Sequence, residues 1–242
     1  MCYNYSVPDF KVLEHRFRAR FDSTISFSRV YYVSGFTKPQ LPVITNNATK
    51  RIQLFTWGLI PHWVPDTDTA TKFRGRTLNA RAETIHEKPS FRGLIATQHC
   101  LVLADGFFEW RHYRGRTFPY YIQLMNRGPF SFAGLWDQWM HPSTQQVLNT
   151  YSIITTRANW LLEQVHNKRK RMPVILVPDD EERWLSSELT RKEIDSLLVS
   201  YDASQMQVHP VSRRIHAAGV PRNIPETIKP VTYPELPPIK RL

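Results

Sequence analysis

CLVLADGFFEW, residues 100–110, is the stretch of sequence that bears most directly on the fold. Its first five residues are all apolar, as in a strand buried on both faces, and the Asp-Gly pair at 105–106 indicates a turn. A second strand is expected to begin at Phe107. Its alternation places Phe107 and Glu109 on one face and Phe108 on the other. The stretch therefore predicts two consecutive strands, the second of which carries a carboxylate among aromatic side chains.

Apolar runs of strand length recur on both sides of this stretch. On the C-terminal side they are PYYIQL (119–124), FSFAGLW (130–136), YSIITT (151–156) and MPVILV (172–177). On the N-terminal side, the run from Ile52 to Trp63 predicts a further strand. An exposed, basic loop is expected to follow it around Lys72, Arg74 and Arg76. The chain is therefore predicted to be rich in β structure.

Helical patterns are weaker than the strand patterns. One covers 158–165, with Thr155 and Thr156 as candidate N-caps, and another covers 180–198. Strands and helices follow one another without regular βαβ alternation, which predicts an α+β fold rather than a doubly wound one.

The length of the chain is sufficient for one domain. Of its 242 residues, 41% are hydrophobic, which is enough for one sizeable core and does not require a second. We expect this domain to cover 1–216. The segment 217–242 contains six prolines and little periodicity, and is expected to be an extended tail that is either bound to the surface or disordered.

The charge of the chain favours polyanionic partners. A net charge of +11 attracts nucleic acid through counterion release, and the many Trp, Phe and Tyr residues could either fill the core or stack on bases. No apolar run approaches the roughly 20 residues of a spanning helix. Asp9, Lys11 and Glu14 interrupt any signal-peptide core. We expect a cytoplasmic protein that avoids membranes and associates with the nucleoid when bound to DNA.

The cysteines and histidines do not predict a metal site. Cys2 and Cys100 are too few for a disulfide framework or a cysteine-rich zinc site, and spacings such as CxxC or HExxH are absent from the sequence. A glycine-rich phosphate loop is also absent, so no cofactor is expected. Cys100 lies in an apolar run, which is typical of a buried, unreactive cysteine.

Cys2 has the most distinctive chemistry in the chain. Removal of Met1 would leave a free α-amine and a thiol on the same residue, which is a 1,2-aminothiol. Ordinary pKa values of about 7.7 to 8.0 for the amine and about 8.5 for the thiol leave both reactive forms populated near neutrality. Such a group can form a Schiff base with an aldehyde and then close a thiazolidine ring. The ring-opened sugar of an abasic site is one of the few aldehydes in DNA. A second-position cysteine without function is the alternative.

Two other residues are candidates for proton transfer. Glu109 has aromatic neighbours that should raise its pKa, unless it faces water on an edge strand. His166 ends a helical pattern just before the basic run 168–171. Those cations would lower its pKa and attract phosphate, with Arg171 among the candidate DNA contacts. The basic run could equally be a solvated turn.

A polar cluster occurs in LNARAET, residues 78–84. The Asn79 amide could bind a sugar hydroxyl or the cysteine amine, and Arg81 could clamp a phosphate. A turn with an internal salt bridge to Glu83 is the alternative interpretation.

Six motifs in the same order resemble the SRAP family, the SOS-response-associated peptidases that are also described as abasic-site processing proteins. They are Met1-Cys2, WGLIPHW (57–63), NARAET (79–84), DGFFEW (105–110), RMPVIL (171–176) and HPVS (209–212). The resemblance therefore extends from Cys2 to about Ser212. It implies a single compact domain with mixed β-sheets forming a barrel-like core and peripheral helices. It also implies a positively charged cleft for single-stranded DNA near a junction with duplex.

The resemblance also implies roles for individual residues. Cys2 would be the nucleophile that forms a thiazolidine with the abasic sugar, and Asn79 would hold the cysteine end and the sugar. Glu109 would assist proton transfer at the amine. His166 would act as acid and base in opening the sugar and in reversing the crosslink. Trp57 and Arg81 would belong to the DNA-binding surface. Apart from the resemblance, Arg74, Arg76 and Arg171 are expected to contact DNA as basic residues.

This chain departs from the family pattern at two places. Many members begin Met-Cys-Gly-Arg, whereas Tyr3 and Asn4 follow the cysteine here. The usual histidine stands two residues before the arginine of RMP, but that position is Arg169 in this chain. His166 would have to reach the same place through the longer turn HNKRKRMP.

Three functions remain open at this stage. The first is capture of abasic DNA by a monomer in the SOS response to DNA damage, with a lyase activity arising from the same Schiff base. The second is a thiol peptidase, a hydrolase that acts on its own N-terminus. The third is a non-catalytic module that binds single-stranded nucleic acid, and it predicts that Cys2→Ala keeps full function.

Overall fold

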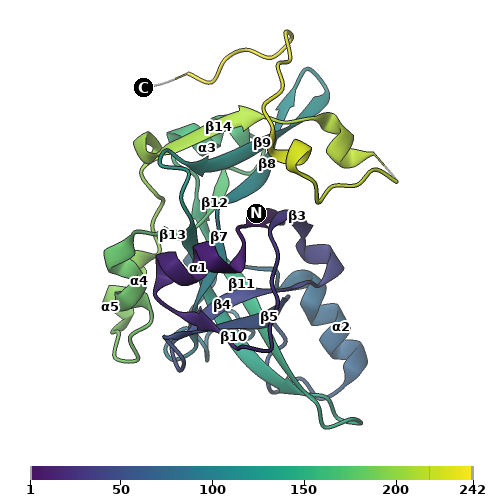
Figure 1. Cartoon of the computed structure of the whole chain (residues 1–242). Helices are drawn as coiled ribbons and strands as arrows, with labels where there is room; N and C mark the ends of the chain where they lie inside the picture. Colours follow the sequence, from purple (N-terminus) through teal and green to yellow (C-terminus); the bar gives the residue numbers. More distant parts are fainter. Residues whose placement is uncertain (1, 218, 241–242) are drawn as a thin grey trace.

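The computed structural model describes residues 2–217 and 219–240 (Figure 1). The strands are β1 (Asn4–Val7), β2 (Arg20–Phe21), β3 (Val30–Ser34), β4 (Gln40–Thr45), β5 (Arg51–Trp57), β6 (Asn79–Arg81), β7 (His99–Ala104), β8 (Gly106–Tyr113), β9 (Arg116–Leu124), β10 (Phe130–Met140), β11 (Val147–Arg157), β12 (Arg171–Pro173), β13 (Ile175–Leu176) and β14 (Met206–Pro210). The α-helices are α1 (Phe10–Phe17), α2 (Thr67–Arg76), α3 (Trp160–Val165), α4 (Pro178–Trp184) and α5 (Arg191–Leu197).

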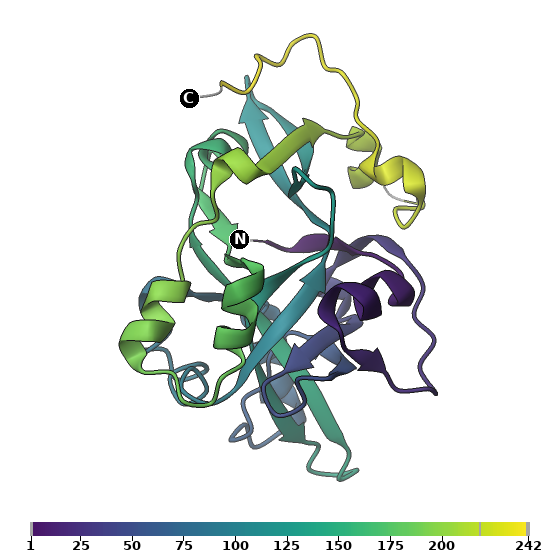
Figure 2. The same ribbon diagram turned by 60° about the vertical axis from the view of Figure 1, so that its left-hand side comes forward.

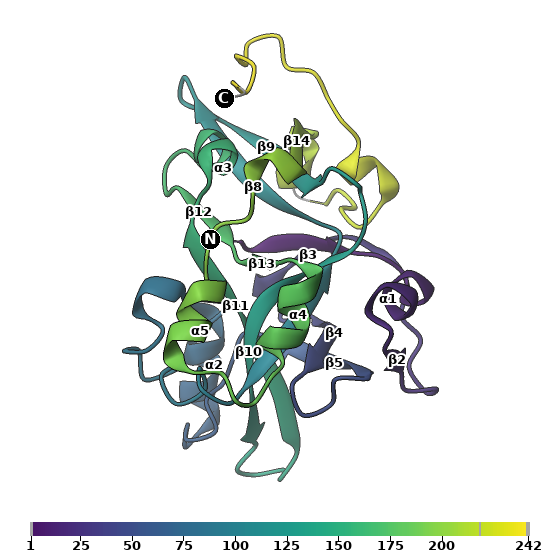
Figure 3. The ribbon, with the colours of Figure 1, turned by 90° about the vertical axis from the view of Figure 1, so that its left-hand side faces the viewer.

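Five strands form a closed barrel. They pair in the order β5, β4, β7, β10 and β11, and the parallel pairing of β11 with β5 closes the ring. The other pairs in the ring are antiparallel, so the barrel is mixed. Its interior is filled by buried residues such as Val102, Phe132 and Ile153. The helices lie around the outside (Figures 1 and 3). The predicted α+β fold with a barrel-like core is confirmed.

A second, antiparallel sheet lies against one end of the barrel. Its strand order is β14, β9, β8, β1 and β3, and Figures 1 and 2 show it above the barrel strands. The chain passes from the barrel to this sheet between β7 and β8, where Asp105 separates Ala104 from Gly106. The stretch CLVLADGFFEW therefore connects the two sheets. As predicted, Phe107 packs in the main core, whereas Phe108 packs in a separate cluster on the other face.

Gly106 is required at this crossover because Tyr121 lies against it. A Cβ on residue 106 would lie 2.1 Å from the Tyr121 hydroxyl oxygen. That hydroxyl is 2.8 Å from the Ser6 hydroxyl, which donates to Asp105, and Asp105 also forms an ion pair with Arg29. The position is therefore enclosed by a buried polar network that cannot shift without losing hydrogen bonds.

Gly106→Ala is expected to lower the free energy of unfolding by about 3 kcal/mol, the upper range for overpacking a closed site. The free energy would be measured by urea denaturation. Gly93→Ala is the matched control, because a Cβ at that glycine meets nothing within 4 Å. Equal stability of the two variants would contradict the close packing inferred for the crossover.

Three expectations about local structure were wrong. The basic stretch around Arg74 is not a loop but helix α2, whose N-cap Asp66 accepts a hydrogen bond from the Thr69 amide. The single helix expected over 180–198 is two helices, α4 and α5, and Thr190 begins the second with a capping box. Helix α3 is capped by Asn159, whereas the expected caps Thr155 and Thr156 lie within β11.

The described part of the tail, 219–240, runs along the second sheet. The Val231 amide donates to the Pro210 carbonyl, and the Tyr233 hydroxyl donates to the Val211 carbonyl. A short 3-10 helix, Pro225–Ile228, lies between the domain and these contacts. Within the described residues, no helix is long and apolar enough to cross a bilayer.

Candidate active site

Cys2 is fully buried and lies two residues before the start of β1. The Asn79 side chain, at the start of β6, donates a hydrogen bond to the Cys2 carbonyl at 2.9 Å. Strand β6 is held in place by its parallel pairing with β11. The buried Oδ1 of Asn79 has no hydrogen-bond partner among the described residues. An acceptor beside the cysteine is therefore available to a ligand.

Glu109 faces the interior from β8 and is 2% exposed. Burial raises the pKa of its carboxyl to about 8, because a charged carboxylate is poorly solvated there. The raised pKa predicted from its aromatic neighbours is confirmed, and the alternative of a solvated edge-strand glutamate is wrong. Burial, with the Glu109 carboxylate as a further cause, also raises the pKa of the Cys2 thiol. The thiol is therefore not a ready source of thiolate.

His166 is the C-cap residue of α3 and lies next to Glu109. Its Nδ1 is 2.9 Å from the Arg171 carbonyl and 3.6 Å from Glu109 Oε2. A carbonyl only accepts hydrogen bonds, so Nδ1 carries the proton of the neutral ring and Nε2 keeps a lone pair.

The pKa of His166 is lowered to about 4. Burial is the main cause, and the positive charge of Arg169 adds to it. The sequence indicated only the second cause. The imidazole is therefore neutral at physiological pH and is suited to accept a proton.

The longer turn HNKRKRMP brings His166, and not residue 169, to Glu109. His166 is buried at the end of α3, whereas Arg169 is exposed in the turn that follows. The turn is closed by hydrogen bonds from the Arg169 and Lys170 amides to the His166 carbonyl, and Lys170 adopts a left-handed conformation with φ 49°. The residues of the turn therefore extend into solvent, while His166 stays buried beside Glu109.

A groove of about 720 Å³ lies beside Asn79, between α2 and the segment 84–91. Four cationic side chains line it, namely Lys72, Arg76, Arg81 and Lys88. All four are exposed. The groove therefore combines positive charge with access to the residue that holds Cys2. Lys72 was expected only as part of a loop, and Lys88 was missed.

Two of the predicted DNA contacts are wrong. Trp57 is fully buried, and its indole N–H donates to the Leu78 carbonyl at 2.9 Å, so it is a core residue. Arg171 is also buried, and its guanidinium is occupied by an ion pair with Glu83 and a hydrogen bond to the Thr155 carbonyl. Glu83 therefore pairs with Arg171, which lies outside NARAET, and not within the motif as the alternative interpretation supposed.

Arg74 and Trp63 both lie near the basic groove, but they differ in exposure. Arg74 is half-buried, and its backbone carbonyl lies against Gly58, so it does not line the groove. Trp63 is 47% exposed and packs edge-to-face on Phe73, which does line the groove. The sequence of WGLIPHW does not indicate which of its two tryptophans is exposed, and only their burial in the folded protein distinguishes them. Trp63 is therefore the one available to stack on a base.

Within the described residues, no group of three or more His, Cys, Asp and Glu side chains gathers as a metal site would require. The site instead consists of a cysteine beside the N-terminus, an amide, a carboxyl of raised pKa and a neutral imidazole. The fold and the site define a class of α+β barrel proteins whose candidate reactive groups gather around Cys2.

Comparisons with known proteins identify the family. The family model described as SOS response associated peptidase (SRAP) matches residues 1–218. Abasic site processing protein YoqW of Bacillus subtilis is 38% identical over 78% of this chain and 81% of its own length. Abasic site processing protein HMCES of Gallus gallus is 32% identical over 72% of this chain and 56% of its own length. This chain therefore belongs to the SRAP family, and the resemblance seen in the six motifs is confirmed.

Solved structures agree with this assignment. A crystal structure of a protein from Bacteroides thetaiotaomicron has a TM-score of 0.89 and 36% sequence identity, and the match covers 96% of this chain and 100% of that one. A second crystal structure, of a protein from Bordetella bronchiseptica, has a TM-score of 0.76 at 23% identity and supports the fold alone.

Proposed function

We propose that this protein senses abasic sites in single-stranded DNA and captures them covalently through Cys2 after Met1 has been removed. The observation that carries the proposal is the hydrogen bond from Asn79 to Cys2, which holds the aminothiol residue in the same site as Glu109 and His166. The names of the relatives point to the same substrate. The basic groove beside Asn79 supports DNA as the polyanion that is bound.

The proposed reaction joins one aldehyde to one aminothiol with loss of water. The neutral α-amine of Cys2 adds to C1′ of the ring-opened abasic sugar, and the carbinolamine loses its hydroxyl as water to give a Schiff base. The thiol sulfur then adds to the same carbon while its proton passes to the nitrogen, which closes a thiazolidine. The Glu109 carboxyl, with a pKa of about 8, can donate the proton to the departing hydroxyl and recover one from the amine. A Schiff base that does not close can undergo β-elimination, which would account for a lyase side reaction.

His166 would act on the sugar. Its neutral ring presents Nε2 as a base for the sugar hydroxyl, so that the closed sugar opens to the aldehyde. Reversal runs these steps backwards: the C–S bond opens as the sulfur regains its proton, water adds to C1′ of the Schiff base, and the amine leaves to restore the aldehyde. His166 would pass the protons during these steps. The groove would hold the phosphates at Arg76 and Arg81, and Trp63 would stack on an adjacent base.

Neither alternative is favoured by a specific observation. A thiol peptidase needs a cysteine with a lowered thiol pKa, whereas burial raises the pKa of Cys2. A purely binding module does not need a buried carboxyl and a buried imidazole 3.6 Å apart.

The proposal is tested on a denaturing gel with single-stranded DNA that carries one abasic site. The wild-type protein, with loss of Met1 verified by mass spectrometry, is expected to form a shifted band. The same DNA reduced with borohydride has no aldehyde and is the matched control. A band with both DNAs, or with neither, would overturn the aldehyde-trapping mechanism.

His166→Ala is expected to slow reversal of the crosslink by about 100-fold and to slow its formation less, because general acid–base catalysis contributes on this scale. Since the pKa of His166 is about 4, the effect should be constant between about pH 6 and pH 8. Purified crosslink would be incubated with an excess of unlabelled abasic DNA, and release would be followed on gels. His15→Ala, which alters an exposed histidine of α1, is the control. Wild-type reversal in the His166 variant would show that the role assigned to this residue is wrong.

A further inference from the structure

Asn167, the residue after His166, attaches the histidine to the strand that carries Glu109. Its Oδ1 accepts a hydrogen bond from the His112 amide at 3.0 Å, and its Nδ2 donates to the His112 carbonyl at 2.8 Å. The side-chain amide thereby reproduces the two-bond pairing of a peptide group in a sheet. His112 is three residues beyond Glu109 on β8. The turn after α3 is therefore joined directly to this strand.

Gln164, two residues before His166, makes the same kind of two-bond pair with the C-terminal tail. Its Nε2 donates to the Lys240 carbonyl at 2.8 Å, and its Oε1 accepts from the Lys240 amide at 2.8 Å. The tail is in turn joined to β8, because Arg111 donates to the Pro237 carbonyl at 2.7 Å. The two amide side chains therefore flank the histidine and connect it, directly or through the tail, to one strand.

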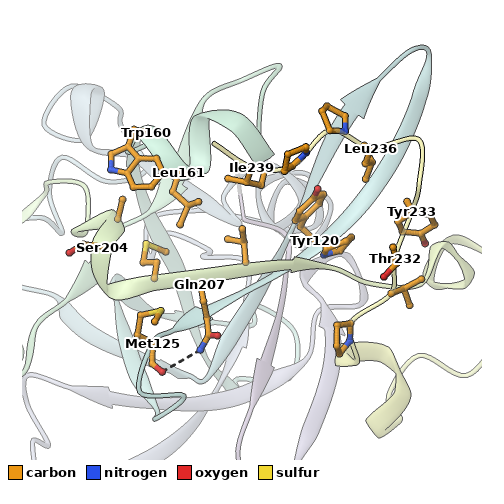
Figure 4. Close-up of a pocket in the computed structure, with 18 residues that line it drawn as sticks. Tyr120, Met125, Trp160, Leu161, Ser204, Gln207, Thr232, Tyr233, Leu236 and Ile239 are labelled. Atoms are coloured by element: carbon orange, nitrogen blue, oxygen red, sulfur yellow. Dashed lines mark hydrogen bonds between the residues drawn. The ribbon is translucent and has the colours of Figure 1, made fainter. Parts of the chain in front are cut away.

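A cavity of about 860 Å³ lies between the tail and the domain. Figure 4 shows Leu236 and Ile239 of the tail along one side of it and Trp160 and Leu161 of α3 at one end. Leu236 and Ile239 pack against the core here, and the hydrogen bonds of Gln164 and Arg111 fix where the tail meets α3 and β8. Residues beyond 218, where the family match ends, thus support the histidine.

We infer that Asn167 and Gln164 are positioning residues that together hold His166 against Glu109. The turn that follows His166 is exposed from Asn167 to Lys170 and is longer than the family pattern requires. Its own hydrogen bonds close the turn but do not connect it to β8. The amide pair of Asn167 supplies that connection, and the pair of Gln164 fixes the other side of the histidine. An imidazole held at 3.6 Å from a carboxyl needs such support, since small displacements strongly reduce proton transfer.

The direct test is an NMR titration of the His166 ring in DNA-free, full-length protein carrying Asn167→Ala, Gln164→Ala or both. Among residues 2–217 and 219–240, charged and titratable groups that act on this ring include Glu109 and His112 of β8 and Arg169 of the turn, and all three are retained in each variant. In the wild type the ring should stay neutral down to about pH 4. In the variants the ring gains access to water, and the midpoint should rise by at least about one pH unit toward the ordinary value of about 6.5.

The control is Asn149→Ala, which removes an exposed amide pair with Gln138 on the β10–β11 hairpin. It should leave the His166 titration unchanged. A midpoint in the Asn167 and Gln164 variants equal to that of the wild type would overturn the inference.

A second readout rests on the proposed function. Crosslink reversal in the Asn167 and Gln164 variants should slow by about tenfold, while Cys2 still forms covalent product. If the wild type forms no crosslink, the proposed function fails, but the titration still decides whether these residues position His166.

Discussion

Cys2→Ala protein will give no covalent band with abasic single-stranded DNA. The substitution removes the sulfur that closes the thiazolidine and leaves only a reversible Schiff base, which does not survive denaturation. Binding to intact DNA should change by less than about twofold, because the substitution removes no cation from the groove. Covalent product would be measured on a denaturing gel and affinity by fluorescence anisotropy at fixed salt.

Two cysteine variants make this prediction specific. Cys2→Ser keeps the amine, so borohydride should trap its Schiff base although no stable product forms without the reductant. Cys100→Ala should crosslink as the wild type does, because Cys100 lies within β7 and its nitrogen belongs to a peptide bond, so it is not an aminothiol. Covalent product from Cys2→Ala without reductant would exclude the thiazolidine. Loss of covalent product in Cys100→Ala, but not in Cys2→Ala, would show that the nucleophile is Cys100 and not Cys2.

Glu109→Gln is expected to slow crosslink formation by about 100-fold, the scale of a lost general acid–base group. The amide keeps the shape of the carboxyl but cannot donate and recover a proton. In the wild type the rate should rise from about pH 6 as the α-amine loses its proton, with an ordinary pKa of about 7.7 to 8.0. Above pH 8 the rate should fall, because the Glu109 carboxyl, with a pKa of about 8, loses the proton that it donates. Single-turnover rates from pH 6 to pH 9.5 would test this.

The Gln variant should lack the fall of the crosslinking rate above pH 8.

The stability of the Gln variant provides a control for folding. Folding raises the pKa of Glu109 from 4.5 to about 8. The stability that the protonated carboxyl contributes is therefore complete below about pH 4.5 and is lost as the pH rises to about 8. The melting temperature of Glu109→Gln should therefore fall less over this range than that of the wild type. A wild-type rate profile in a folded Gln variant would refute the role of Glu109.

The parts of the site that follow from local pattern were predictable. Strand alternation placed Glu109 on the same face as Phe107, and the aromatic neighbours indicated its raised pKa. The chemistry of an aminothiol follows from Cys2 being the second residue. These features depend on residue type and on neighbours one or two positions away, which a single sequence contains.

The errors arose where burial decides between similar residues. Trp57 and Trp63 belong to one motif, yet Gly58, with a φ of 108°, turns the chain between them, and only Trp63 is exposed. Arg171 lies in a basic run, but its pairing with Glu83, 88 positions away, removes it from the surface. Such outcomes depend on contacts between distant segments.

By itself, the sequence determined the α+β class, the membership of the SRAP family and the candidate reactive groups, because periodicity and side-chain chemistry are local properties. The tertiary structure alone decided that β11 closes the barrel on β5 and that Asn79 meets Cys2 across 77 positions. It also decided that His166 reaches Glu109 through a longer turn supported by Asn167 and Gln164. The physical reason is that these contacts form only when the hydrophobic core brings distant strands together, and the resulting burial then sets the pKa values of the groups inside the site.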